Sequence, residues 1–144
     1  MLKIDMHTHI MPKVLPDWTS RFGYGGFIHL DHHRPGFARM MQGEKFFREI
    51  ESNCWDPEVR IQEYARYKTH VQVVCTIPVL FAYWAKPQDG LAVAEFLNDH
   101  IAEIIQSRPK QYLGLATLPM QDVDLAIREL HRAKSMGFKG IQIG

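Results

Sequence analysis

The sequence predicts an α/β fold built on a parallel sheet, because short apolar segments alternate with amphipathic helical segments along most of the chain. Two further observations support this class. Helical segments connect the successive strand-like segments, and a crossover between parallel strands needs a connection of that length. The 144 residues are 46% hydrophobic and 23% charged, which is the composition of a globular domain with a core of its own.

The first strand is predicted at residues 3–7, KIDMH, and the following IMPKVLP cuts it short. Residues 11–55 interrupt the regular alternation. They contain the glycine-rich GYGG and alternating stretches such as FIHL and KFFREI, which predict an excursion with short antiparallel strands. We therefore expect residues 1–144 to be the N-terminal part of a single domain that carries an irregular or short-stranded insertion at about 11–55.

A regular pattern begins at Asp56, which is placed to cap a helix with Pro57 at the first helical position. The apolar, β-branched segment 70–78 predicts a buried strand. An amphipathic helix is expected next, ending at Pro109. Its apolar face contains Leu91, Ala94, Leu97, Ile101, Ile104 and Ile105.

A third strand is predicted at residues 112–119, followed by a helix that ends with Gly137 as its C-cap. This helix is expected to bury one apolar stripe, formed by Val123, Ala126, Ile127, Leu130 and Ala133. A final strand begins at residues 140–144, GIQIG, and no helix follows it. That ending is typical of a partial product rather than a finished domain, since it leaves a sheet edge uncovered.

Two architectures are compatible with this order of elements. One is a doubly wound open sheet, and the other is part of a (β/α)8 TIM barrel. A whole barrel typically needs about 250 residues, so four strands would make roughly half of one.

Composition excludes several classes of protein. The formal net charge is +1 and the basic residues are scattered, which argues against a nucleic-acid-binding surface. The apolar runs are too short to span a bilayer, and no signal peptide is visible. The two cysteines, Cys54 and Cys75, are expected to be reduced thiols of a cytoplasmic protein.

Two histidines, His7 and His9, stand at the end of the first predicted strand. Because side chains alternate across a strand, they should project to one side together with Asp5, while Ile4 and Met6 face the helices. In a barrel, the histidines would then point inward at the carboxyl ends of the strands, where active sites lie. The spacing is suited to sharing one metal ion, although a catalytic zinc site typically uses three protein ligands.

The alternative is that these are two unrelated histidines, because the chain contains eight. The other six are interpreted as surface or partly buried structural residues: His29, His32, His33, His70, His100 and His131. Tyr83 and Trp84 follow the second regular strand. They could line a substrate pocket or pack a loop against the barrel rim, and the sequence does not favour either.

The stretch KIDMHTHIMP resembles the first-strand motif of the amidohydrolase superfamily, which consists of metal-dependent (β/α)8 barrels. The segments RFGYGGFIHLDHH, FREIESNCWDPEVRIQEY, TIPVLFAYWAKPQD and GLATLPMQDVDLAIREL resemble one decarboxylase family within it. The resemblance implies a divalent metal, zinc, held by four ligands of which His7 and His9 match two. It also implies that Arg48 binds a carboxylate of a small dicarboxylate substrate. The planar guanidinium suits this role, because it can donate two parallel hydrogen bonds to a carboxylate.

The implied reaction is a non-hydrolytic decarboxylation in tryptophan breakdown by the kynurenine route. It converts 2-amino-3-carboxymuconate semialdehyde to 2-aminomuconate semialdehyde. The family's remaining metal ligands and its catalytic base would lie beyond Gly144, so this chain alone is expected to be inactive. A homodimer is implied for the full-length protein. The alternatives are another enzyme of the superfamily, either an aromatic-acid decarboxylase or a metal-dependent hydrolase, and a non-catalytic fragment.

Overall fold

A parallel sheet of four strands runs through the computed structural model, which describes residues 1–144. Its strands are β1 (Ile4–His9), β5 (Val71–Cys75), β6 (Tyr112–Ala116) and β7 (Gly140–Ile141). Their order across the sheet, β1-β5-β6-β7, is also their order along the chain. A doubly wound sheet reverses its strand order at a switch point, so this arrangement is that of a barrel wall.

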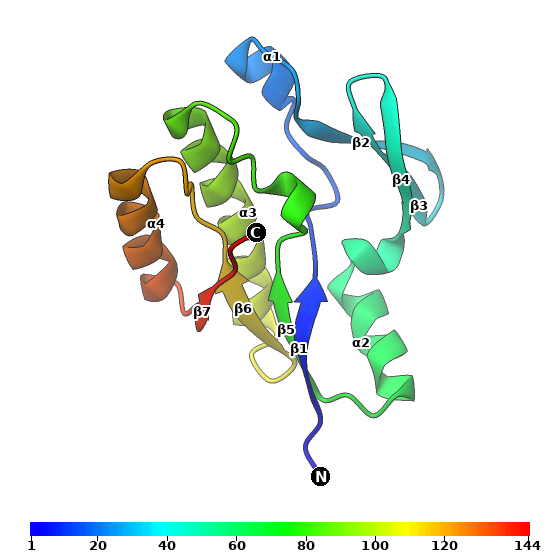
Figure 1. Ribbon diagram of the computed structural model, residues 1–144. Helices are drawn as coiled ribbons and strands as arrows, with labels where there is room; N and C mark the ends of the chain where they lie inside the picture. Colours follow the sequence, from blue (N-terminus) through cyan, green and yellow to red (C-terminus); the bar gives the residue numbers. More distant parts are fainter.

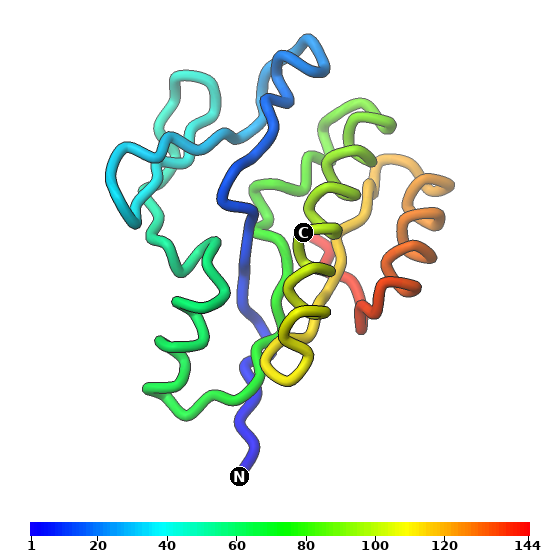
Figure 2. The backbone as a smooth tube through the Cα atoms, turned by 180° about the vertical axis from the view of Figure 1, so that it is seen from behind, coloured from blue at the N-terminus to red at the C-terminus, as the bar shows by residue number.

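Helices connect these strands, as predicted. They are α2 (Pro57–Arg66), α3 (Pro87–Ser107) and α4 (Val123–Ser135). Figure 1 shows the strands in front of α3, and Figure 2 shows the same helix in front of the strands when the molecule is seen from behind. The predicted start of α2 is confirmed, because the Asp56 carboxylate accepts hydrogen bonds from the backbone N–H groups of Glu58 and Val59.

The core between sheet and helices is built mainly on α3. All six apolar residues predicted for its buried face are buried, so this prediction is confirmed. Ile101 and Val74 are fully inaccessible to solvent and lie in one cluster with Ile10, Tyr112 and Ala116. Although α3 is 21 residues long, neither it nor any other helix here combines the length and apolarity that crossing a membrane requires.

The stripe predicted for α4 is wrong. Val123, Ile127 and Leu130 are exposed, and of the stripe only Ala133 is buried. The buried face instead consists of Leu125, Glu129 and Ala133.

A polar network explains this rotation of α4. The Glu129 carboxylate, 1% exposed, accepts hydrogen bonds from the Arg132 guanidinium at 2.7 and 2.9 Å and from the Asn98 amide at 2.6 Å. Asn98 also accepts from the Thr117 N–H and donates to the Thr117 carbonyl, both at 2.9 Å. A carboxylate with such partners can be buried, so the polar residue turns inward and apolar neighbours turn outward.

A second sheet, antiparallel, forms between β1 and α2. Its strands are β2 (Ile28–Arg34), β3 (Phe37–Gln42) and β4 (Lys45–Glu51), which pair in chain order. The short helix α1 (Trp18–Phe22) precedes it, and two 3-10 turns, η1 (Ser52–Cys54) and η2 (Pro78–Leu80), complete the elements. The sequence did not predict α1. Figure 1 shows α1 and this sheet beyond the carboxyl ends of the parallel strands, opposite the N-terminus.

Candidate metal site

The candidate site lies at the carboxyl end of β1, where the strand continues through both histidines rather than stopping at residue 7. The Nε2 atoms of His7 and His9 lie 3.2 Å apart, and their rings meet edge to face with centroids 4.9 Å apart. Two nitrogens bound to one tetrahedral ion at roughly 2.0–2.1 Å would be about 3.3 Å apart. The separation of the two Nε2 atoms therefore matches a pair that shares one metal ion.

The neighbouring strand β5 fixes the orientation of the His9 ring. His9 Nδ1 lies 3.2 Å from the Thr76 carbonyl oxygen. Because a carbonyl only accepts, Nδ1 carries the proton, and the lone pair is on Nε2, which faces His7. This is the arrangement of a metal-ligating histidine whose second nitrogen is held by a backbone carbonyl.

Cys75 completes the environment of this ring. Its Sγ lies 3.3 Å from His9 Nδ1, and its thiol donates to the Thr8 carbonyl at 3.2 Å. Burial raises the pKa of Cys75 to about 11, so the thiol stays protonated at neutral pH. Cys75 therefore packs against His9 as a neutral group and supplies no thiolate ligand.

The surroundings of His9 favour its neutral form. Burial, followed by the charge of His7 as the next largest cause, lowers the pKa of His9 below its ordinary value, and the hydrogen bond to Thr76 offsets part of this. A metal ligand must be deprotonated, so a lowered pKa favours metal binding at neutral pH.

The prediction that Asp5 shares a face with the two histidines is wrong. Asp5 is paired with Gln72 and His9 with Cys75, but the register shifts between Asp5 and Thr8. This β-bulge breaks the alternation of the strand. The Asp5 carboxylate therefore approaches α2, where it helps raise the pKa of Tyr64, mainly raised by burial. Ile4 and Met6, expected to face the helices, are 41% and 67% exposed.

The two imidazoles fit part of a divalent metal site. Imidazole nitrogen is a common ligand for zinc and for other first-row metals. No group of three or more His, Cys, Asp or Glu side chains in residues 1–144 is arranged to hold an ion. The residues of this chain that could hold a metal are therefore His7 and His9, which make up less than the three protein ligands of a typical catalytic site.

Arg48 is an exposed residue of β4. It is paired with Met40, which is 1% exposed, and directly opposed residues of an antiparallel pair point to the same face. Its guanidinium has no carboxylate partner. By contrast, Arg34 of the same sheet donates to Glu49 at 2.9 Å. Arg48 is therefore a cation available to an external anion.

Cys54 lies near both Arg48 and the residues that follow β1. The Arg48 charge lies close enough to Cys54 to lower the pKa of that thiol slightly, although burial raises it overall. The Cys54 carbonyl accepts a hydrogen bond from the N–H of Met11 at 3.0 Å, two residues beyond His9. The structure thus brings His7 and His9 into direct contact, and it places Arg48 on a neighbouring sheet without contact to either.

The remaining histidines have structural surroundings. His32 Nε2 lies 2.7 Å from the Lys13 carbonyl, and His33 lies 3.0 Å from Glu49. His70 accepts from the N–H of Lys3 at 3.1 Å. Both cysteines are free thiols, as predicted. The partners of His9 could not be predicted from the sequence, because only the register between β1 and β5 identifies Cys75 and Thr76.

The sequence profile described as amidohydrolase matches residues 4–144. The chain belongs to the amidohydrolase family. Two curated relatives named 2-amino-3-carboxymuconate-6-semialdehyde decarboxylase match 99% of this chain. One, from Dictyostelium discoideum, is 55% identical over 144 residues, and the other, from Caenorhabditis elegans, is 40% identical over 162 residues. The chain spans 40% of the length of each.

A solved structure agrees with the fold. A dihydroxybenzoic acid decarboxylase from Polaromonas sp. JS666, solved with bound manganese and 2-nitroresorcinol, superposes with a TM-score of 0.67. The alignment covers 97% of this chain and 37% of that one at 22% identity, so it speaks for the fold alone. The predicted class, about the first half of a barrel of the amidohydrolase type, is confirmed by this match together with the strand order.

Proposed function

We propose that the intact protein is a zinc-dependent, non-hydrolytic decarboxylase that converts 2-amino-3-carboxymuconate semialdehyde to 2-aminomuconate semialdehyde. The names of the two relatives support the substrate, and the manganese named for the Polaromonas enzyme supports a divalent metal. The single structural observation that carries the proposal is the 3.2 Å between the Nε2 atoms of His7 and His9. We further propose a cytoplasmic location and a place in tryptophan breakdown.

In this proposal His7 and His9 hold the metal through their Nε2 atoms. The ion would supply Lewis-acid chemistry and lower the pKa of bound water toward about 7. The Thr76 carbonyl keeps the His9 proton on Nδ1, and the Cys75 thiol packs beside the same nitrogen. These contacts orient the ring before a metal arrives, which lowers the entropy lost on binding.

Arg48 would bind a carboxylate of the substrate. A guanidinium presents two parallel N–H donors to a carboxylate, and Arg48 has no internal partner to displace. Holding the substrate by one carboxylate orients the other for loss as carbon dioxide, which is a positioning contribution to the reaction. The proton that replaces the carboxylate needs a general acid or base, which we propose to lie beyond Gly144 together with the other metal ligands.

A second candidate is a decarboxylase of an aromatic acid, because the structure with manganese comes from such an enzyme. Turnover of the muconate semialdehyde compared with that of a dihydroxybenzoate separates the two. A metal-dependent hydrolase and a non-catalytic fragment are the remaining alternatives. We expect residues 1–144 alone to be inactive, and the intact protein to be a homodimer in sedimentation.

The test uses the intact protein loaded with zinc. Loss of the absorbance of the semialdehyde and release of one carbon dioxide are measured for the wild type, His7→Ala and His9→Ala. Both variants should lose metal and turnover together, by about a thousandfold or more in rate, because each removes a ligand. His131→Ala is the matched control, since His131 is exposed on α4. Full turnover by either ligand variant would refute the proposal.

A further inference from the structure

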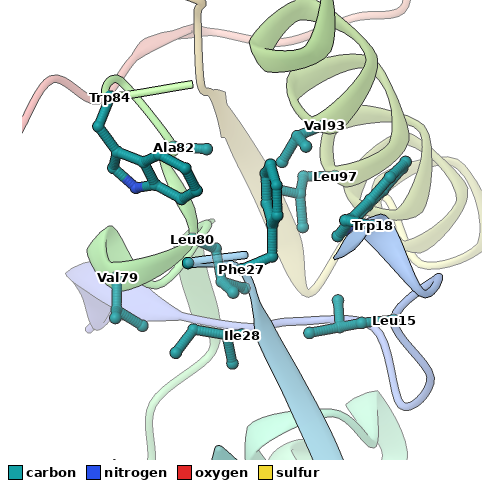
Figure 3. A pocket seen from close by; sticks show the side chains of 11 residues that line it. Leu15, Trp18, Phe27, Ile28, Val79, Leu80, Ala82, Trp84, Val93 and Leu97 are labelled. Carbon is teal, nitrogen blue, oxygen red and sulfur yellow. The ribbon is translucent and has the colours of Figure 1, made fainter. Parts of the chain in front are cut away.

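The loop between β5 and α3 packs against the loop that precedes the antiparallel sheet, and aromatic side chains dominate this contact. The Trp84 ring lies 4.7 Å from the Phe27 ring, measured between centroids. Tyr24 donates to the Asp89 carboxylate at 2.7 Å and accepts from the Lys86 N–H at 3.1 Å. Figure 3 shows Phe27 between Trp84 on one side and Val93 and Leu97 of α3 on the other, and all four side chains line a small cavity.

The contact is closely packed at Gly26. A Cβ at this position would lie 2.7 Å from Cη2 of Trp84, closer than side-chain atoms approach. Gly26 also has a φ of 107°, a conformation that favours glycine. The adjacent cavity holds about 20 Å³, which is room for one water molecule at most. The indole therefore requires a residue without a side chain beneath it.

Each side of this contact is itself held in place. On the side of the parallel sheet, the Gln121 amide donates to the carbonyls of Ala82 at 3.4 Å and Ala85 at 3.2 Å. On the side of the antiparallel sheet, the Gln42 amide donates to the Gly26 carbonyl at 2.8 Å. Gln42 is the last residue of β3, the strand that pairs with β4 and so with Arg48.

We propose that Trp84 is a positioning residue, which seats on Gly26 and Phe27 and thereby holds the antiparallel sheet so that Arg48 faces the substrate bound at His7 and His9. The inference rests on the proposed role of Arg48. Trp84 has no contact with either histidine and acts through β3 and β4. The sequence left open whether Trp84 lines a substrate pocket or packs the loop. The contacts with Gly26 and Phe27 favour the packing role.

The expected consequence concerns substrate binding more than metal binding. A displaced Arg48 weakens the carboxylate contact, which raises KM, while β1 and β5 continue to hold the two imidazoles. In the intact protein, Gly26→Ala should raise KM for the semialdehyde about tenfold and leave the zinc content unchanged. Gly25→Ala is the matched control, because a Cβ at Gly25 has no heavy atom within 4 Å. Its KM should change by less than about twofold.

Trp84→Leu provides a second variant that does not depend on the backbone at Gly26. It should raise KM in the same way, and in the double variant the two effects should be less than additive, because both remove one contact. If Gly26→Ala does not fold, the KM of Trp84→Leu alone tests the positioning role. An unchanged KM in Trp84→Leu would overturn the positioning role of Trp84. A zinc content that falls by the same factor as KM rises would overturn it as well.

Hydrogen exchange separates this inference from the proposed reaction. In Gly26→Ala or Trp84→Leu, amide exchange in residues 37–51 should become at least tenfold faster, while exchange in residues 71–75 stays as in the wild type. If the wild type does not decarboxylate the semialdehyde, the proposed function fails, and hydrogen exchange alone tests whether Trp84 holds the antiparallel sheet. Unchanged exchange in residues 37–51 would overturn the positioning role of Trp84, whatever the reaction is.

Discussion

Four of the five residues of β5 are buried, whereas only one of the seven residues of β4 is. The parallel sheet is covered by α3 on one face, and its strands carry the groups that orient His9. The antiparallel sheet buries Ile28, Ala38, Met40 and Ile50 in a core cluster shared with Val93 and Leu97 of α3. Two further contacts join it to the rest of the chain, the packing of Trp84 on Gly26 and the hydrogen bond from Met11 to Cys54. In the proposed enzyme, the metal ligands would lie on the more deeply buried parallel sheet, and Arg48 would bind the substrate from the more exposed strand β4.

The largest expected effect concerns the difference in burial between the two sheets. Ile101 is fully buried between α3 and the sheet, so Ile101→Ala should lower the free energy of unfolding by about 2–5 kcal/mol, measured by urea denaturation. Phe47→Ala, on the exposed β4, should change it by less than about 0.5 kcal/mol. Equal losses in the two variants would remove the distinction between the two sheets.

The next effect concerns the two arginines of the antiparallel sheet. Arg48→Ala should raise KM of the intact enzyme roughly 30- to 160-fold, because a charged hydrogen-bonded contact contributes about 2–3 kcal/mol. Arg48→Lys should fall between wild type and alanine, since lysine keeps the charge and loses the fork.

Arg34→Ala is the control for this experiment, because Glu49 already occupies that guanidinium. It should change KM by less than about threefold. A comparable rise in KM in Arg34→Ala would show that the sheet as a whole, rather than the free cation, binds the substrate.

A smaller effect is expected for the pH dependence of the free energy of unfolding. His100 on α3 is partly buried, its Nδ1 has no hydrogen-bond partner, and burial lowers its pKa from 6.5 to about 4. Between pH 6.5 and about 4, His100 is therefore protonated in the unfolded chain and neutral in the folded chain. The free energy of unfolding falls as the pH falls through this range. His100→Gln should make the loss between pH 7 and pH 4.5 smaller by about 2 kcal/mol. Parallel stability curves for wild type and variant would contradict this.

The sequence was a good guide where a pattern is local. The apolar face of α3 and the Asp56 cap of α2 follow from residues a few positions apart, and both are observed. The stripe of α4 could not be predicted, because burial of Glu129 depends on Asn98, which is 31 positions away in the sequence. Helix α1 has only five residues, too few for a periodic signal.

The candidate site shows the same limit. The spacing of His7 and His9 predicted their convergence, but the β-bulge that turns Asp5 toward α2 depends on the register with β5. Likewise, the position of Arg48 opposite Met40 depends on the register between β3 and β4. Its role as a carboxylate ligand came from resemblance and stays a prediction.

In the proposed enzyme, His7 and His9 bind one metal ion through their Nε2 atoms. X-ray absorption at the zinc edge of the intact, zinc-loaded protein counts imidazole ligands directly. Relative to wild type, His7→Ala and His9→Ala should each lose one imidazole from the coordination sphere or lose the ion altogether. Full zinc occupancy with an unchanged imidazole count in either variant would contradict the account.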